Sequence, residues 1–392
     1  MDIQPAQSQP QRPRARDLGV RIGRLEPGTW NAITDVAGVR VGYTTVIAGE
    51  GPLVVGQGPV RTGVTVVLPR AAAESDDPVF AGYHVLNGNG EMTGTIWLTE
   101  SGLLESPVAI TNTHSVGVVH DALISYVVRH PEQYGDLAWS LPVVAETYDG
   151  FLSDINGMHV RPEHVFAALD SATSGPIAEG CVGGGTGMMC HGFKGGTGTA
   201  SRVLPVEQGG WTVGALVQAN YGQRRLLRVD GIPVGELIPP EVVPLPEVPS
   251  QPAAQDEQAT QEQGAGSIIV VIATDAPLLP HQCRRLAQRA TLGVARMGGL
   301  GENSSGDIFL AFSTANRGLR ATLAPGETHT ARMLPPYALT PLFEAAGEAT
   351  EEAILNALCA ATTTTGINGR VAYALPHDRL QDTLRIAGRL RV

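Results

Sequence analysis

One abrupt change of composition divides the chain near residue 266. Residues 239–264 hold six prolines, five acidic residues and no lysine or arginine, and such a segment cannot bury enough apolar surface to offset its ordering entropy. Gly266-Ser267 and the apolar, β-branched run IIVVIAT follow at once, which is typical of a strand buried on both faces. We therefore predict a flexible, exposed acidic linker over 239–264 that leads directly into a central strand headed by Ser267.

A serine at the head of a strand behind such a linker has an unusual chemical option. If the Gly266–Ser267 peptide bond is cut, Ser267 becomes an N-terminus that carries both a hydroxyl and an α-amine. An α-amine has a pKa of about 7.7–8.0, so it can act as a base toward that hydroxyl near physiological pH. Gly266 suits such a cleavage, because the missing Cβ gives access to the scissile carbonyl. The alternative is a serine that merely begins a strand, and the local sequence leaves both interpretations open.

The composition narrows the class of protein. The 392 residues carry a net charge of −11, which argues against a nucleic-acid binder and against docking on anionic lipid. Four scattered cysteines without a C-x-x-C pair favour a reduced, cytoplasmic protein without a structural zinc site. The polar start of the chain shows no Sec signal peptide, which leaves export by another route open, and no apolar run is long enough to span a membrane. We expect residues 1–17 to form a disordered arm.

Strands and helices are expected to alternate along residues 18–392, which we treat as one domain with the α/β layering that this pattern favours. Strands are predicted at 38–47, 63–69, 107–111, 141–147, 211–219, 267–274 and 308–314. Helices are predicted at 115–130, 161–172, 280–296, 340–360 and 377–389. Ser115 is expected to cap the first of these helices, because serine is a favoured N-cap residue.

Familiar catalytic signatures do not occur in the sequence. The chain has no G-x-S-x-G and no H-E-x-x-H, which removes the main support for an α/β-hydrolase or a zinc peptidase. The glycine-rich run 175–198 does not fit a Walker A loop, because Phe193 stands between Gly192 and Lys194. We expect its glycines to line a cleft or to let backbones approach closely, and we predict no metal or cofactor.

Eight blocks of sequence nevertheless occur together in one order. They are WNAITDVAGVRVG (30–42), NGNGEMTG (87–94), ITNTHSVG (110–117), VVAETYDG (143–150), GCVGGGTGMMCHGFKGGTGTASR (180–202), VQANYG (217–222), GSIIVVIATDAPL (266–278) and NSSGDIFLAFSTAN (303–316). With this set the chain resembles the L-aminopeptidase D-Ala-esterase/amidase and β-peptidyl aminopeptidase family of self-processing serine aminopeptidases. The resemblance implies a four-layer αββα sandwich of the N-terminal-nucleophile type. It also implies cleavage into a large chain, 18–266 behind the arm, and a small chain, 267–392, and assembly as a homotetramer.

The resemblance assigns the chemistry to four residues. Ser267 matches the nucleophile released by cleavage at Gly266–Ser267, and Asn220 matches an amide that helps to form the oxyanion hole. Ser305 and Asp307, in SSGD, match the pair that orients the nucleophile, although some members of the family have glutamate at the position of Asp307. Whether this pair or the α-amine is the main base is left open. The alternatives are a turn residue for Asn220 and a tight turn for SSGD.

Two further residues match substrate-side positions of the family. Glu146 would bind the free ammonium of an N-terminal residue through a charge-assisted contact, and the phenol of Tyr148 would donate to the oxyanion or to the scissile amide. A solvated strand end is the alternative for both. Glu91 is expected near the cleft without an assigned role, and His114 is expected to be structural, at the start of a helix.

The expected function is therefore that of a self-processing serine aminopeptidase, amidase or esterase without metal or cofactor. It would release N-terminal residues from short peptides, amides or esters through an acyl-enzyme on Ser267, with its own cleaved chain as partner and without nucleic acid or membrane. One alternative is an ornithine acetyltransferase-like acyl transferase, which has the same fold type but cleaves itself before a threonine. Another is an intact oligomeric binding module whose linker is only a spacer.

Overall fold

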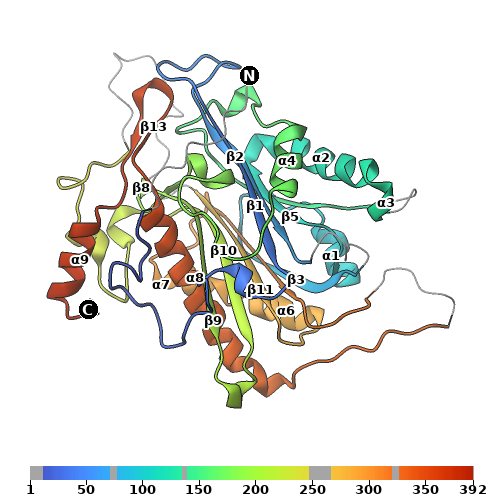
Figure 1. Cartoon of the computed structure of the whole chain (residues 1–392). Helices are drawn as coiled ribbons and strands as arrows, with labels where there is room; N and C mark the ends of the chain where they lie inside the picture. The colour runs from blue at the N-terminus through green and yellow to red at the C-terminus, as the bar shows by residue number, and fades with distance from the viewer. Residues whose placement is uncertain (1–11, 71–76, 135–138, 247–265, 320–325, 392) are drawn as a thin grey trace.

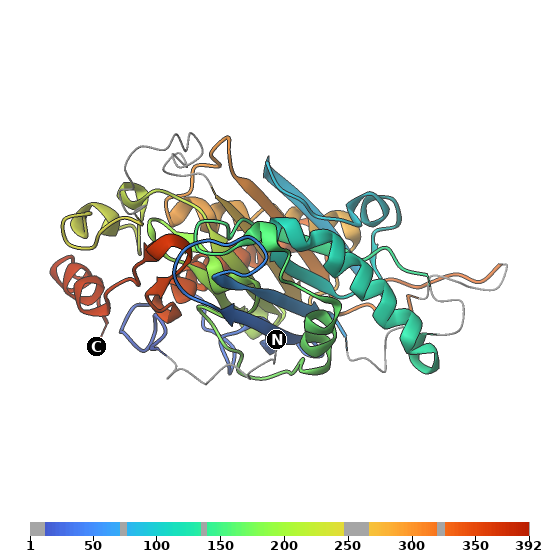
Figure 2. The same ribbon diagram turned by 90° about the horizontal axis from the view of Figure 1, so that it is seen from above.

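Two β-sheets lie face to face in the middle of the molecule, and helices cover both outer faces (Figure 1). The computed structural model describes residues 12–70, 77–134, 139–246, 266–319 and 326–391. Seen from above, the sheets and their helices form successive layers (Figure 2). The predicted αββα sandwich is confirmed.

The first sheet has four strands in the order β1-β2-β5-β6. They are β1 (Arg40–Ala48), β2 (Val60–Leu68), β5 (Val108–Asn112) and β6 (Val143–Thr147). β5 and β6 run parallel, and the other neighbours are antiparallel. On the outer face, Val64, Ala109 and Val144 pack in one apolar cluster with helices α2 (Val116–Arg129) and α4 (Pro162–Asp170). Alternate residues of these strands therefore face opposite layers.

The second sheet has six strands in the order β4-β3-β12-β11-β10-β9. They are β3 (Val79–Gly88), β4 (Leu103–Leu104), β9 (Gly196–Val203), β10 (Thr212–Asn220), β11 (Ser267–Thr274) and β12 (Gly306–Ser313). The two strands that follow the acidic segment, β11 and β12, are parallel and lie between strands that precede it. The chain segments on either side of residue 266 thus build one sheet together.

Helices from the second half of the chain cover the outer face of this sheet. They are α6 (Pro280–Ala287), α7 (Ala290–Arg296) and α8 (Thr340–Ala360), which share one apolar cluster with β9 to β12. Between the sheets, Ile110 and Ala145 of the first sheet pack with Leu216, Ile269 and Leu310 of the second. This inner apolar layer is what the β-branched strand patterns predict.

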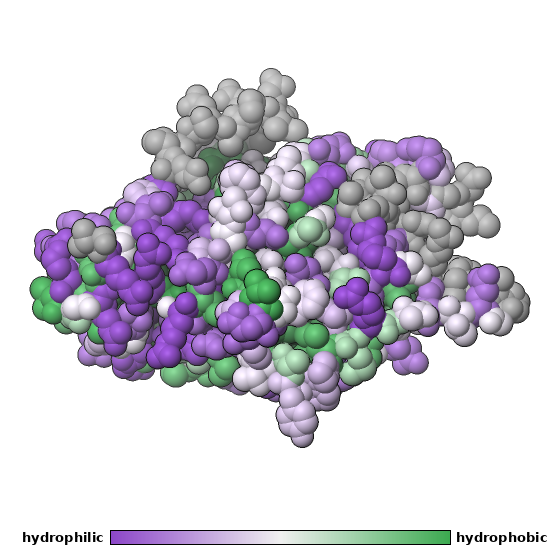
Figure 3. Space-filling view, turned by 60° about the horizontal axis from the view of Figure 1, so that its bottom comes forward, coloured by the Kyte–Doolittle hydropathy of each residue, from purple (hydrophilic) through white to green (hydrophobic). Residues whose placement is uncertain are grey.

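Short elements complete the described part of the chain. They are α1 (Thr95–Ser101), α3 (Pro131–Tyr134), α5 (Val234–Leu237), α9 (His377–Ile386), β7 (Met189–Cys190), β8 (Phe193–Lys194), β13 (Thr364–Thr365) and β14 (Val371–Ala372). Hydrophilic and hydrophobic residues are interspersed on the face shown in Figure 3. None of the helices in the described ranges has the length and apolar character needed to cross a membrane.

The structure corrects two predictions about helices. Instead of one helix over 280–296 there are two, because the chain tightens at Arg289, whose N–H bonds back three residues to the Leu286 carbonyl. Ser115 precedes α2 but makes no side-chain capping bond. Its backbone is already helical, at the end of a short turn, whereas a capping serine needs extended backbone. The sequence also missed β3, β9 and α1.

The predicted disordered arm is wrong for residues 12–17, and residues 1–11 lie outside the described residues. Ala15 is fully buried and its N–H donates to Asn356 Oδ1 at 3.0 Å. Arg16 forms an ion pair with Glu352 at 2.8 Å. The partners of Arg12 and Arg16 lie more than 300 positions away along the chain, so the local sequence could not show that this segment is ordered.

The predicted acidic linker is wrong at its start. Of the segment 239–264, residues 239–246 are described, and there Val243 is buried while its carbonyl accepts a hydrogen bond from Arg224 Nη1 at 2.9 Å. Residues 247–264 lie outside the described part of the chain. The described structure before Ser267 thus extends further along the chain than the composition suggests.

Candidate active site

Gly266 and Ser267 lie at the head of β11, in the middle of the second sheet. Ser267 pairs with Asn220 of β10 on one side and with Gly306 of β12 on the other. Ile269, two residues along the strand, belongs to the apolar layer between the sheets, and because side chains alternate in a strand, Ser267 faces that same layer. The predicted nucleophile is therefore buried at one end of the inter-sheet layer, with 5% of its surface exposed.

The main-chain N–H of Gly306 holds the Gly266–Ser267 bond in place. It donates to Ser267 Oγ at 3.2 Å and to the Gly266 carbonyl oxygen at 3.1 Å. One donor thus keeps the hydroxyl and the carbonyl of the predicted scissile bond together. The crowding here requires glycine at 266, because a Cβ would lie 2.0 Å from the Asn220 carbonyl oxygen.

Ser305 and Asp307 form a buried, hydrogen-bonded pair on either side of Gly306. The Ser305 hydroxyl donates to Asp307 Oδ1 at 2.6 Å. Burial raises the pKa of Asp307 from its usual 3.8 to about 6, although the hydrogen bonds from Ser305 and from the Ile268 N–H favour the ionised form. A carboxylate with such a pKa is able to accept a proton near neutral pH.

Asn220 ends β10, and both ends of its side-chain amide are bonded. Oδ1 accepts a hydrogen bond from the Met189 N–H at 2.8 Å, and Nδ2 donates to the Tyr148 carbonyl oxygen at 3.0 Å. The Met189 contact fixes which end of the amide is the donor. Because directly opposite residues on one face of an antiparallel pair lie about 5 Å apart, this donor is close to Ser267.

Glu146 is a buried carboxyl group on β6 whose hydrogen-bond donors are neutral. Oε1 accepts from the Glu91 N–H at 3.1 Å, and Oε2 accepts from the Thr113 hydroxyl. Burial raises the pKa of Glu146, and these two hydrogen bonds oppose that effect. A Cβ on Gly90 would lie 3.1 Å from both Glu146 Oε1 and Gly306 Cα, so this carboxyl group lies close to the start of β12.

Tyr148 directly follows β6 and is 40% exposed, unlike the other predicted site residues. Burial of part of the ring, with a smaller effect of the neighbouring Asp149, raises the pKa of its phenol. The phenol therefore stays protonated and able to donate at neutral pH. All six predicted side chains lie at or next to the ends of β6, β10, β11 and β12.

A layer of buried polar groups around this site was not predicted. Asp149 is fully buried, accepts a hydrogen bond from Asn112 Nδ2 at 3.0 Å, and has a pKa raised by burial to about 7. Gln218 joins the two sheets, since its Nε2 donates to Thr147 Oγ1 at 2.7 Å. The signal was present in the sequence, because Asp149 and Gln218 are polar interruptions within the same motifs as Tyr148 and Asn220.

Two other candidates from the sequence are not among the six predicted site side chains. His114 is exposed in the turn Thr113–Ser115, directly before α2, so only its predicted place at the start of a helix agrees with the structure. Lys194 of the glycine-rich run is buried and donates to main-chain carbonyls, so it is not available for phosphate. Within the described ranges, no three His, Cys, Asp or Glu side chains gather as a metal site.

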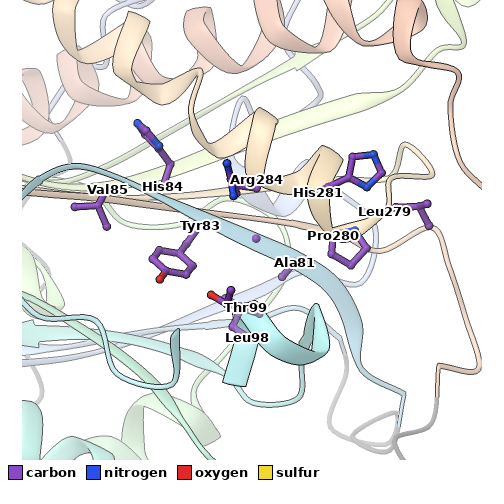
Figure 4. A pocket seen from close by; sticks show the side chains of 11 residues that line it. Ala81, Tyr83, His84, Val85, Leu98, Thr99, Leu279, Pro280, His281 and Arg284 are labelled. Atoms are coloured by element: carbon purple, nitrogen blue, oxygen red, sulfur yellow. The ribbon is translucent and has the colours of Figure 1, made fainter. Parts of the chain in front are cut away.

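A cavity of about 590 Å³ lies elsewhere, along the edge of β3 (Figure 4). Tyr83 and His84 of β3, Thr99 of α1 and Arg284 of α6 contribute to its lining. The lining contains none of the six predicted site side chains, all of which the structure describes. The predicted site at the end of β11 is therefore separate from this cavity.

Comparisons with known proteins agree with the geometry. The profile of Peptidase family S58 matches residues 31–372. The chain is 55% identical to the beta-peptidyl aminopeptidase BapA of Sphingosinicella microcystinivorans over 380 residues, which cover 96% of this chain and 93% of that protein.

Two solved structures have the same fold. A beta-aminopeptidase from a Burkholderia species superposes with a TM-score of 0.85 at 54% identity, covering 96% of this chain and 99% of the other. The L-aminopeptidase D-Ala-esterase/amidase of Ochrobactrum anthropi, described as a prototype serine aminopeptidase and a variant of the Ntn hydrolase fold, does so with a TM-score of 0.84 at 46% identity, covering 96% and 99%. The chain therefore belongs to peptidase family S58 and is a hydrolase of the aminopeptidase class.

Proposed function

We propose that this S58 peptidase cleaves itself at Gly266–Ser267 and then works as a serine aminopeptidase on short peptides, amides or esters. The observation that carries the proposal is the shared donor at the head of β11. The Gly306 N–H bonds both to the Gly266 carbonyl oxygen and to Ser267 Oγ. This supports an attack of the hydroxyl on the preceding carbonyl, because the two reacting groups are already held together.

In the self-cleavage step, Ser267 Oγ forms a bond to the Gly266 carbonyl carbon and its proton passes to the Ser305–Asp307 pair. The C–N bond then breaks, the amine takes up a proton, and an ester remains. Water hydrolyses this ester to a Gly266 carboxylate and a free Ser267. The raised pKa of Asp307, about 6, supports its role as a proton acceptor near neutral pH.

In the mature enzyme, the same hydroxyl attacks the carbonyl of a substrate. Asn220 Nδ2 donates to the developing oxyanion, and removing such a donor typically costs about 2.7–4 kcal/mol of transition-state stabilisation. An acyl-enzyme forms on Ser267, the leaving amine or alcohol departs with a proton, and water releases the acid. Either the α-amine of Ser267 or the Ser305–Asp307 pair serves as base.

Glu146 and Tyr148 make the enzyme an exopeptidase. The Glu146 carboxyl group is buried among neutral donors, so a substrate ammonium would supply its missing countercharge. Tyr148, with its protonated and partly exposed phenol, donates to the substrate at the mouth of the site. The relatives named beta-peptidyl aminopeptidase and beta-aminopeptidase favour N-terminal β-amino acids as substrates.

The test is a Ser267→Ala variant, assayed with chromogenic β-alanyl and L-alanyl amides. We expect an unsplit chain and no turnover above background, whereas wild type splits and prefers the β-alanyl amide. Ser304→Ala, a change two residues before Gly306, is the matched control and should behave as wild type. A Ser267→Ala chain that still splits or hydrolyses an amide would contradict the proposal. Acetyl transfer from N-acetylornithine, measured in parallel, tests the acyl transferase alternative, against which membership of a peptidase family argues.

We also propose that the two cleaved chains stay associated and that the protein is a homotetramer. Association is supported by the second sheet, in which β10 and β3 flank β11 and β12. Assembly is supported by the exposed segment 326–336, which follows an extended path at the edge of the molecule (Figure 1). It continues into Tyr337, which is 96% exposed and is thus free to contact another copy of the chain. Native mass spectrometry should give four copies of both chains, and a monomer would overturn the assembly without affecting the chemistry.

A further inference from the structure

The chain contains a single lysine, Lys194, among 27 basic side chains, and this lysine is fully buried. All other cationic side chains are arginines. Lysine is almost never fully buried unless its charge is compensated, and burial lowers the pKa of Lys194. Because burying a lysine costs free energy, we expect Lys194 to have a specific role in the glycine-rich run.

The side-chain amine of Lys194 is bonded to two main-chain carbonyls. Nζ donates to the Gly195 carbonyl at 2.9 Å and to the Gly185 carbonyl at 3.3 Å. The charge of the nearby Cys181 side chain favours the protonated form of this amine. Lys194 thereby ties together the parts of the glycine-rich run that enter and leave the β7–β8 hairpin.

That hairpin carries the main-chain group that orients Asn220. Met189 of β7 pairs with Lys194 of β8, and the Gly195 N–H closes the hairpin on the Met188 carbonyl at 2.9 Å. The Met189 N–H then donates to Asn220 Oδ1. The contacts form a continuous path from the buried ammonium to the side-chain amide beside Ser267.

We infer that Lys194 is a positioning residue of the active site, which holds the β7–β8 hairpin so that Met189 presents Asn220 with its donor end toward the oxyanion. This inference rests on the proposed function, because it takes Asn220 as an oxyanion donor. It also explains the glycine-rich run without a phosphate ligand, because the Gly185 and Gly195 carbonyls of this run bind the Lys194 side chain. Arginine would fit this position less well, because its donors lie in one plane on three nitrogens, whereas all donors of lysine are on one nitrogen.

The test is a double-mutant cycle between Lys194→Met and Asn220→Ala in the processed enzyme. Since an oxyanion donor is worth ~10²–10³ in kcat, we expect K194M alone to lower kcat by about 10–100-fold with little change in KM. In the N220A background the same change should lower kcat by less than about 2-fold, because the donor that Lys194 positions is already gone. Equal losses in both backgrounds, or no loss in either, would overturn the inference.

Two controls separate positioning from general damage. Leu384→Ala removes a fully buried side chain from α9 and should lower Tm without lowering the kcat of the folded enzyme. If K194M does not fold, Lys194→Gln replaces it in the cycle, because its amide keeps a donor although the side chain is one bond shorter.

A crystal structure distinguishes a failure of this inference from a failure of the proposed function. In a crystal structure of the Lys194 variant, the hydrogen bond from the Met189 N–H to Asn220 Oδ1 should be lost or lengthened, and an unchanged bond would overturn the inference whatever the activity. A wild-type protein without Ser267-dependent turnover would instead overturn the proposed function.

Discussion

Two clusters of buried ionisable side chains differ in how their charges are compensated. In the first, where α8 meets β9, Arg202 binds Glu348 at 3.0 Å and Glu352 at 2.7 Å, and Arg16 also binds Glu352. In the second, at the head of β11, the carboxyl groups receive hydrogen bonds mainly from hydroxyl, amide and main-chain donors. We call them the ionic cluster and the catalytic cluster.

The pKa shifts of the two clusters follow this difference in charge compensation. Burial alone would raise the pKa of Glu352, but the neighbouring Arg202 and Arg16 outweigh it and the pKa is lowered. In the catalytic cluster burial prevails, so the pKa values of Asp307 and Asp149 rise to about 6 and about 7. The ion pairs of the ionic cluster hold α8 and β9 together. The carboxyl groups of the catalytic cluster lack a cationic partner, which is typical of a site that binds a substrate or exchanges a proton.

The largest effect that we expect to separate the two clusters is a loss of activity on changing Asp307. Asp307→Asn removes the proposed proton acceptor, so we expect kcat to fall by about 10²–10⁴-fold, while Tm stays equal or rises because a costly buried carboxyl group is gone. Initial rates and thermal unfolding of the same preparation check both. A large loss of Tm would show that Asp307 belongs functionally with the ionic cluster.

The complementary change in the ionic cluster should act on stability. Arg202→Met leaves Glu348 and Glu352 without their shared cation, and removing one partner of a buried pair costs about 3–5 kcal/mol. Tm should drop strongly, with kcat per folded molecule near wild type at low temperature. An unchanged Tm would break the distinction between the two clusters.

A smaller effect is expected for recognition of the substrate ammonium. Glu146→Gln should lower kcat/KM by about 10–100-fold, since hydrogen bonds to charged groups contribute about 1.5–3 kcal/mol. Glu91→Gln is the matched control, because Glu91 contacts Glu146 through its main-chain N–H, and it should leave kcat/KM unchanged. Equal effects of both changes would remove Glu146 from substrate binding.

The pH dependence should be the mildest effect and of opposite sign for activity and stability. Folding favours protonated Asp307 and Asp149, so their stabilising contribution is complete below their unfolded pKa values and is lost as pH rises through about 6 and 7. Tm should therefore fall between about pH 4 and 7 while kcat/KM rises with a midpoint of about 6. Asp149→Asn should flatten the fall in Tm, and a rise in Tm over this window contradicts the assignment.

The ionic cluster predicts the reverse behaviour in acid. The lowered pKa of Glu352 means that its contribution is complete above its usual pKa of 4.5 and is lost as pH falls below that value. Thermal unfolding below about pH 4.5 should thus show a loss of stability that Arg202→Met reduces, while Arg16 maintains the remainder.

The sequence predicted those parts of the fold that depend on local pattern. The β-branched run after Ser267 is typical of a buried strand, as found. β9 was missed because its first three residues lie in the glycine-rich run, and β3 because it ends in Asn87 and Gly88. The site motifs were found through their order in the chain. Asp149 and Lys194 were missed, because their roles come from contacts with Asn112 and Gly185 that no local pattern encodes.

The central claim is that the Gly266–Ser267 bond is cut and that Ser267 gains an α-amine. The single, buried lysine gives a direct measurement, because reductive dimethylation of the native protein should modify α-amines only. Intact mass and peptide sequencing of fully active enzyme should show two labelled amines, one at the start of the chain and one on Ser267. An active enzyme labelled at its original start alone, with one chain of 41.1 kDa, would contradict the account.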